Sequence, residues 1–102
     1  MPDYIIAYHG GEKPESPEEG ARRMAKWQAW LADLGDAVVN PGTPLGKSKT
    51  ISSDAISETD GSSRLTGFSI VKAASMDAAL EMAKACPFLD MGTLEVAEVM
   101  EI

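Results

Sequence analysis

The sequence contains few of the side chains that usually carry chemistry. Its 102 residues include one cysteine, one histidine and only 6% aromatic residues. A single cysteine excludes an intramolecular disulfide, and one histidine with one cysteine cannot supply the usual ligand set of a zinc ion. We therefore expect no metal site and no cofactor.

Long apolar runs are also lacking. The longest, such as YIIAY at positions 4–8, are far shorter than the roughly 20 residues that a membrane-spanning helix needs. The opening MPDYIIAYHGG lacks the basic start and the long apolar core of a signal peptide. Together with the single cysteine, these features predict a cytoplasmic protein.

Positive charge is scarce. Nine lysines and arginines stand against 16 acidic residues, which gives a net charge of −7. An excess of negative charge repels phosphate backbones and anionic lipids, so we expect neither nucleic acid nor a membrane as a partner. Arg22, Arg23 and Lys26 lie on one predicted helix, and we interpret them as balancing the acidic residues of that helix.

The sequence does contain the periodicity of one α+β domain. Its length suits a single domain over residues 1–102. The patterns predict strands at 3–9, 36–40, 65–72 and 93–102, helices at 17–34 and 76–85, and a possible hairpin from 47–53 and 55–58. We expect the segment NPGTPLG, at 40–46, to be a loop. The order β-α-β-β-α-β is that of the ferredoxin-like split β-α-β fold, an antiparallel sheet with both helices on one side.

The first predicted helix has clear signals at both ends. Ser16 can cap its start, Glu19 can complete a capping box, and Gly35 suits a left-handed stop. We expect at least one of Trp27 and Trp30 to pack on the sheet, while the other could line a ligand pocket, since a buried indole N–H requires a partner. The apolar stripe of this helix consists of Met24, Trp27, Leu31 and Leu34.

The strands carry apolar residues on both faces, with Ile5, Ala7, Val71 and Val99 in one set and their opposites, Phe68 and Ile70 among them, in the other. Four strands about 4.8 Å apart make a sheet about 19 Å wide, and two helices about 10 Å across cover that width only once. An uncovered sheet face would expose an apolar patch larger than a soluble monomer usually tolerates. We therefore predict a two-fold homodimer, packed sheet against sheet. The alternative is that the polar segment 42–63 folds over the bare face.

The chain also resembles the YCII-related (YciI-like, or DGPF-domain) proteins. The likeness rests on the opening YIIAYHG, on LADLGDAVVNPGTPL at 31–45, on the turn TDGSS at 59–63, and on GFSIVKAASMDAALEMAKACPFLDMGTLEVAEV at 67–99. It covers nearly the whole chain, and its last third is the most specific part. The resemblance implies a single YCII-related domain that forms a dimeric α+β barrel with an antiparallel sheet.

The resemblance implies less about function. Most members of the family are uncharacterised, and many DGPF-domain members are encoded beside extracytoplasmic-function sigma factors. YciI-like members are suspected enzymes because they carry a His in the first helix and an Asp before the Pro that follows the second. In this sequence Met24 stands near the place of that His, Cys86 replaces the Asp, and Ser62 and Ser63 replace the Pro-Phe of the turn. A His–Asp mechanism therefore does not carry over to this chain.

His9 is the strongest candidate for acid/base chemistry, because it ends a strand before two glycines where a ligand could come close. The alternative is a structural histidine bonded to backbone or water. Cys86 ends a helix, whose negative dipole disfavours a thiolate, so we expect a buried, inert thiol. The candidate ligand-binding residues are Trp27, Asp60, Ser62 and Arg64; the last three share one turn, and Arg64 could hold an anion.

Three functional hypotheses follow. The first is a ligand-binding or regulatory homodimer, and the second is a small enzyme that uses His9 as a base on a small organic molecule. The third is a protein-interaction partner in stress signalling, which predicts an exposed apolar patch outside the dimer seam. An enzyme should place His9 in a concave pocket near a carboxylate. A binding module could leave His9 outside a cavity lined by Trp, Met and Phe.

Overall fold

The computed structural model describes residues 1–11, 15–59 and 63–101. Most of the predicted elements are confirmed, with boundaries that differ by a few residues. In chain order the elements are β1 (Asp3–Gly10), α1 (Pro17–Leu34), η1 (Gly35–Ala37), β2 (Val38–Pro44), β3 (Lys49–Ile51), β4 (Ile56–Glu58), β5 (Leu65–Lys72), α2 (Met76–Lys84), η3 (Pro87–Asp90) and β6 (Gly92–Glu98).

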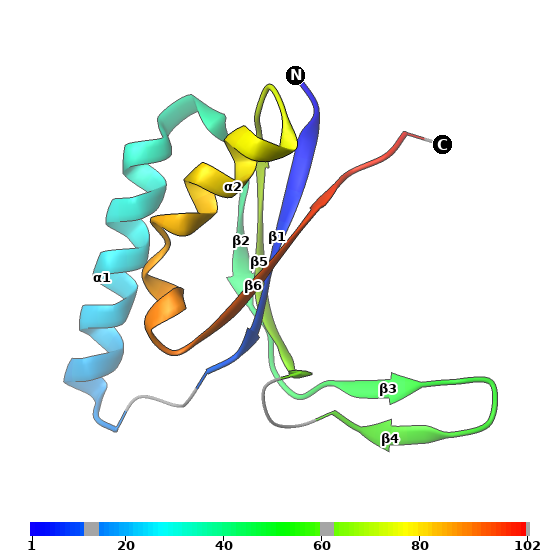
Figure 1. The fold of residues 1–102 in the computed structure, drawn as a ribbon. Helices are drawn as coiled ribbons and strands as arrows, with labels where there is room; N and C mark the ends of the chain where they lie inside the picture. The colour runs from blue at the N-terminus through cyan, green and yellow to red at the C-terminus, as the bar shows by residue number, and fades with distance from the viewer. Residues whose placement is uncertain (12–14, 60–62, 102) are drawn as a thin grey trace.

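The main sheet has four strands in the order β2-β5-β1-β6, and each neighbouring pair is antiparallel. The two helices lie on the same side of this sheet (Figure 1). The described residues thus form an α+β layer structure of the ferredoxin-like type, as the element order predicts. Strands β3 and β4 form a separate two-stranded hairpin.

Local signals set the helix ends. The side chain of Ser16 accepts a hydrogen bond from the Glu19 amide at 3.1 Å, and Ser75 does the same for the Ala78 amide in α2. The carboxylate of Glu19 accepts from the amide of Glu15 at 3.0 Å, one residue before the amide that a capping box would use. Capping by Ser16 is therefore confirmed, although the reciprocal bond reaches one residue further back.

The prediction of a loop at 40–46 is wrong for most of its length, because β2 begins at Val38 and continues to Pro44. The strand stays paired with β5 through two irregularities in register. At Gly42 the backbone has φ = 80°, and a Cβ there would collide with the carbonyl oxygen of Phe68. Two prolines are tolerated here because β2 is an edge strand, on which an amide can be missing without breaking the sheet.

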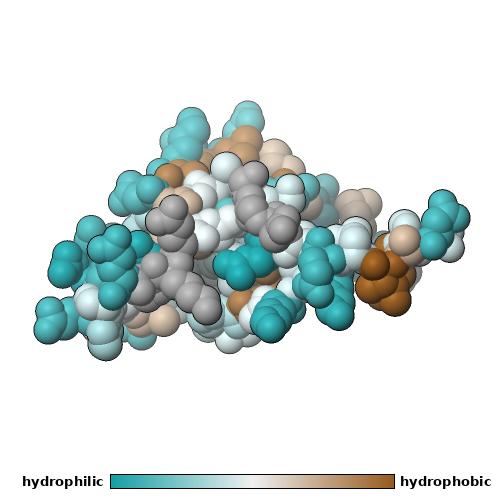
Figure 2. All heavy atoms as spheres, turned by 90° about the horizontal axis from the view of Figure 1, so that it is seen from below, coloured by the Kyte–Doolittle hydropathy of each residue, from teal (hydrophilic) through white to brown (hydrophobic). Residues whose placement is uncertain are grey.

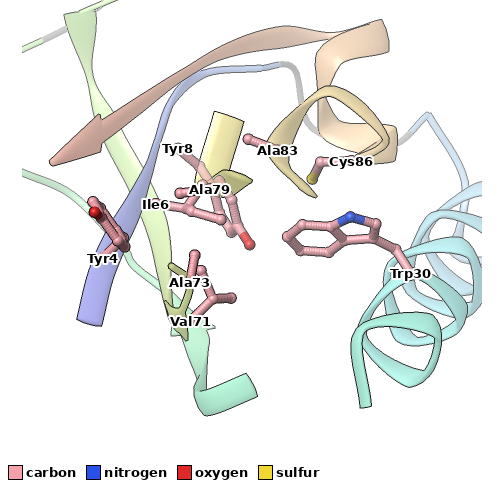
Figure 3. Close-up of a cluster of buried hydrophobic side chains, with 9 residues drawn as sticks. All are labelled: Tyr4, Ile6, Tyr8, Trp30, Val71, Ala73, Ala79, Ala83 and Cys86. Carbon is pink, nitrogen blue, oxygen red and sulfur yellow. The ribbon is translucent and has the colours of Figure 1, made fainter. Parts of the chain in front are cut away.

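The core lies between the sheet and the helices (Figure 3). Trp30 is the one buried residue of α1, and its indole N–H donates to the carbonyl of Met82 at 3.0 Å. Met24, expected in the apolar stripe, is instead 41% exposed. The helix is therefore rotated toward Trp30 relative to the predicted stripe. The buried cluster consists of Tyr4, Ile6, Tyr8, Trp30, Val71, Ala73, Ala79, Ala83 and Cys86.

The second face of the sheet has no helix on it (Figure 1). Ile5, Ala7, Phe68 and Ile70 lie on this face and are half-buried, while their strand neighbours on the helix face are buried. The β3–β4 hairpin projects away from the strand ends and does not lie across this open face (Figure 1). The described part of segment 42–63 is therefore not the cover that the sequence left as an alternative, and the homodimer stays a prediction.

Candidate functional site

A pocket of about 490 Å³ lies between the N-terminal half of α1, the sheet and η3. Its walls come from segments far apart in the sequence, which the fold brings together. It combines aromatic and apolar side chains with a charged rim, as small-molecule sites commonly do. The described residues that line it are Tyr8, Glu19, Gly20, Arg22, Arg23, Met24, Lys26, Trp27, Thr43, Pro44, Thr66, Pro87, Phe88, Asp90 and Met91.

Three aromatic residues form one wall of the pocket. The rings of Tyr8 and Phe88 stack with centroids 5.2 Å apart. Trp27 approaches from α1, and its indole nitrogen lies 3.1 Å from the Tyr8 hydroxyl. Gly67 pairs with Tyr8 across the strands, and a Cβ at Gly67 would lie 2.9 Å from the Tyr8 ring. The ring can therefore lie across β5 only because residue 67 has no side chain.

The Tyr8 hydroxyl belongs to a chain of hydrogen bonds whose direction is fixed. The Ser69 hydroxyl lies 2.7 Å from the carbonyl oxygen of Pro41, which can only accept, so Ser69 donates to it. The Tyr8 hydroxyl, 2.5 Å from Ser69, must then donate to Ser69. The indole of Trp27 can only donate, so it donates to Tyr8. This Trp27–Tyr8–Ser69–Pro41 chain connects α1 to β1, β5 and β2.

Two pocket residues have shifted pKa values, and both shifts lead away from neutrality. Burial raises the pKa of Tyr8 above its ordinary value near 10, although its hydrogen bonds to Ser69 and Trp27 act in the opposite direction. The bond from the Glu15 amide lowers the pKa of Glu19, and the guanidinium of Arg23 adds to this effect. A catalytic acid or base works best with a pKa close to the working pH. Neither Tyr8 nor Glu19 is therefore tuned for proton transfer near pH 7.

The rim of the pocket is more positive than the chain as a whole. Arg22, Arg23 and Lys26 line the pocket beside two carboxylates, Glu19 and Asp90. Arg23 is held by Glu19 at 2.7 Å, in an ion pair between residues one helical turn apart. Three cations against two anions leave a small local excess of positive charge, in a chain whose net charge is −7. This rim would attract an anionic group on a ligand.

His9 lies outside this pocket. It is on the open face of the sheet, and its side chain is 23% exposed. Its Nε2 atom lies 3.0 Å from a carboxylate oxygen of Glu95 on β6, and its Nδ1 atom lies 3.3 Å from the carbonyl oxygen of Ser63. Both neighbours are acceptors, so a neutral imidazole can donate to only one of them at a time. His9 therefore has the carboxylate that an enzyme would need, but it does not line the pocket.

The other predicted site residues also differ in whether they line the pocket. Trp27 lines the pocket, whereas Arg64 is not among the described residues that do so. Asp60 and Ser62 lie outside the described residues. Cys86 is 3% exposed, and burial raises the pKa of its thiol, in agreement with the expectation of a buried thiol.

Sequence reasoning missed the residues that surround Trp27 in the pocket. Tyr8 lies within the predicted strand 3–9 and carries no motif, and Phe88 and Met91 follow a helix end that carries none either. The one usable signal was Gly67, because a glycine within a strand often marks a place where another group comes close. Met24 does line the pocket, near the place where the family resemblance puts a histidine.

Within residues 1–11, 15–59 and 63–101, no three His, Cys, Asp or Glu side chains gather in an arrangement that could hold a metal ion. No helix in the described part of the chain has the length and apolar character needed to cross a membrane.

These features define a small α+β protein of the ferredoxin-like type, with an aromatic pocket between its first helix and its sheet. The model of the YCII-related domain matches residues 4–102, and the chain belongs to the YCII-related family. None of the curated proteins matches the chain significantly.

Among solved structures, the chain is similar to 5-chloro-2-hydroxyhydroquinone dehydrochlorinase (TftG) from Burkholderia phenoliruptrix AC1100, solved as a complex with 2,5-dihydroxybenzoquinone. The TM-score is 0.56 and the identity is 19%, over 95% of this chain and 93% of that chain. At this identity the likeness shows a shared fold.

Proposed function

We propose that this protein is a cytoplasmic, ligand-binding homodimer with a regulatory role, and that its pocket takes a small, flat, acidic organic molecule. The observation that carries the proposal is the composition of the pocket. Trp27 and Phe88 offer ring faces, Met24 and Met91 offer adaptable apolar contact, and Arg22 and Lys26 offer positive charge at the rim.

The position of His9 supports binding over catalysis. The one histidine of the chain lies outside the pocket, and the resolved pKa shifts within the pocket move Tyr8 and Glu19 away from neutrality. The solved relative supports the ligand class, because it holds 2,5-dihydroxybenzoquinone, a flat molecule with acidic hydroxyl groups.

The open sheet face supports the homodimer. Ile5, Ala7, Phe68 and Ile70 form an apolar layer that nothing in the described chain covers. A second copy would cover it through the same residues, in the manner of two packed sheets.

Calorimetric titration with 2,5-dihydroxybenzoquinone tests the binding site. We expect the wild-type protein to bind it, and Phe88→Ala and a double Arg22→Gln, Lys26→Gln variant to bind at least about tenfold more weakly. A His9→Ala variant is the matched control and should bind as the wild type does. Equal binding by all four proteins would place the ligand elsewhere, and a loss confined to His9→Ala would move the site to the open face.

A second candidate function rests on the contact between His9 and Glu95. A carboxylate beside an imidazole can orient it for acid/base chemistry, and in a sheet-to-sheet dimer this pair would be enclosed by the partner. This enzyme would release chloride from a substrate such as 5-chloro-2-hydroxyhydroquinone, and His9→Gln would abolish the release. A binding protein should release no chloride, whichever residue occupies position 9.

A further inference from the structure

The β3–β4 hairpin is well formed, and all the residues of its two strands are exposed. Lys49 and Glu58 are paired across its strands with their charged groups 3.6 Å apart, and the amide of Ser52 donates to the carbonyl of Ala55 at 2.8 Å in its turn. Isolated two-stranded hairpins are only marginally stable in water. A hairpin this regular therefore needs support from another surface.

One face of the hairpin is apolar at its tip. Ile51 and Ile56 are directly opposite each other in the register, and they are 74% and 67% exposed. Thr50 and Ser57 form the pair on the other face. Figure 2 shows an apolar patch toward the outer end of the projecting hairpin, next to hydrophilic surface. Lys49 and Glu58 lie on the same face as Ile51 and Ile56, so this face has an apolar tip with an ion pair nearer its base.

The hairpin lies where a second copy of the chain would be. It projects on the side of the sheet opposite the helices, which is the side of the open face (Figure 1). From Ser48 to the turn at Ser52 it extends about 14 Å, whereas packed sheets lie about 10 Å apart. If two copies pack their open sheet faces together, the tip of each hairpin would pass beyond the plane of the partner's sheet and contact the side of the partner.

The area of the open face favours the same arrangement. Four strands about 4.8 Å apart and seven residues long make a face of about 19 by 24 Å, or about 450 Å² per protomer. Two such faces have a combined footprint of about 900 Å², and stable specific interfaces begin at roughly 1,200 Å² of buried accessible surface. An apolar arm on each protomer would add to the area that the sheet faces bury.

The charges on the open face also suit a second copy. Among its strand residues, Lys72 stands opposite Asp3 in the strand register at one end, and His9 contacts Glu95 at the other. Each end therefore carries a basic and an acidic group, and the face is close to neutral although the chain carries −7. Two copies can meet here without the repulsion that their net charge would cause elsewhere.

We propose that the β3–β4 hairpin is a dimer arm, which grips a second copy of this chain through Ile51 and Ile56 when the two open sheet faces meet. This inference rests on the homodimer of the proposed function, and it assigns the hairpin a role in that dimer.

Sedimentation equilibrium of the full chain tests the arm. We expect a double Ile51→Ser, Ile56→Ser variant to raise the dimer dissociation constant by about tenfold or more. Leu80→Ser, which alters an exposed apolar residue on α2, is the matched control and should leave this constant unchanged. A wild-type dimer dissociation constant in the double variant would contradict the role of the hairpin as a dimer arm, while the dimer itself would stand. A monomeric wild-type protein at all concentrations would overturn the dimer and the arm together.

A photo-crosslinking benzophenone side chain at position 51 supplies a second measurement that does not depend on affinity. We expect it to produce crosslinked homodimer, and the same group at position 80 to produce none. Crosslinks that form only within one chain, or only to a different protein in cell extract, would overturn the assignment of the arm to a second copy.

Discussion

The indole nitrogen of Trp27 lies 3.1 Å from the hydroxyl oxygen of Tyr8, and this contact ties the first helix to the buried face of the sheet. The same contact places the Tyr8–Phe88 stack beside the charged residues of α1. The pocket and the fold therefore depend on some of the same atoms. A substitution at Tyr8 should be visible in stability as well as in binding.

Replacing Tyr8 by Phe removes the central hydroxyl of the hydrogen-bond chain and leaves the buried Ser69 hydroxyl and the Trp27 N–H without this partner. We expect the free energy of unfolding to fall by about 1–3 kcal/mol. Urea denaturation measures it. Tyr4→Phe is the matched control, because Tyr4 is equally buried but its hydroxyl has no protein hydrogen-bond partner among the described residues. Equal losses of unfolding free energy in Tyr8→Phe and Tyr4→Phe would contradict a structural role for the hydrogen-bond chain.

Stability should decrease in alkaline solution, with Tyr8 as one cause. The pKa of Tyr8 is raised on folding, so the unfolded chain loses this proton first. The stabilisation is complete below about pH 10 and is lost as the pH rises through the raised pKa. Burial raises the pKa of Cys86 in the same sense, with an onset near pH 9. Urea denaturation between pH 8 and 11 should show a shallower decline for Tyr8→Phe and for Cys86→Ala than for the wild type.

Gly67→Ala should destabilise the protein, because the added methyl group would lie 2.9 Å from the Tyr8 ring and 3.3 Å from the carbonyl oxygen of Thr43. We expect a loss of about 1–3 kcal/mol, the usual cost of overpacking in a core. Gly46→Ala is the control, since nothing lies within 4 Å of its Cβ position, and it should be close to neutral. Thermal unfolding of both variants measures the difference. An unchanged melting temperature in Gly67→Ala would show that the ring can move away.

Cys86 should be protected from alkylating reagents in the folded protein. Its side chain is buried and its pKa is raised, so both access and thiolate formation are suppressed. We expect iodoacetamide at pH 8 to modify the native protein at least on the order of 100-fold more slowly than the protein in urea. Mass spectrometry follows the reaction. Rapid modification of the native protein would mean that the segment between α2 and η3 opens easily.

The sequence predicted the features that depend on residues close together in the chain, and it missed the features that depend on residues far apart in it. The caps at Ser16 and Ser75 follow from side chains three residues from the amides they bind. The extension of β2 to Pro44 depends on its register with β5, more than 20 residues away, and no local pattern encodes it. A segment rich in proline and glycine therefore looked like a loop.

The same limit applies to the candidate site. Trp27 could be proposed for a pocket because an indole N–H needs a partner, but its partner proved to be Tyr8, from a strand 19 residues earlier. The position of His9 on the open face followed from the alternation of β1, yet its contact with Glu95 required the pairing of the first strand with the last. Alternation along a strand gives the face of a residue, while its neighbours on that face depend on strand order.

The two prolines of β2 have one more consequence, for aggregation. Pro41 and Pro44 lack amide hydrogens, and the register irregularities between Val38 and Thr43 further interrupt the row of backbone donors on this edge of the sheet. An incoming β-strand from a neighbouring molecule would find no continuous template there. Within the described part of the main sheet, addition of a strand is therefore hindered at β2, and β6 is the opposite edge, where a strand could still be added.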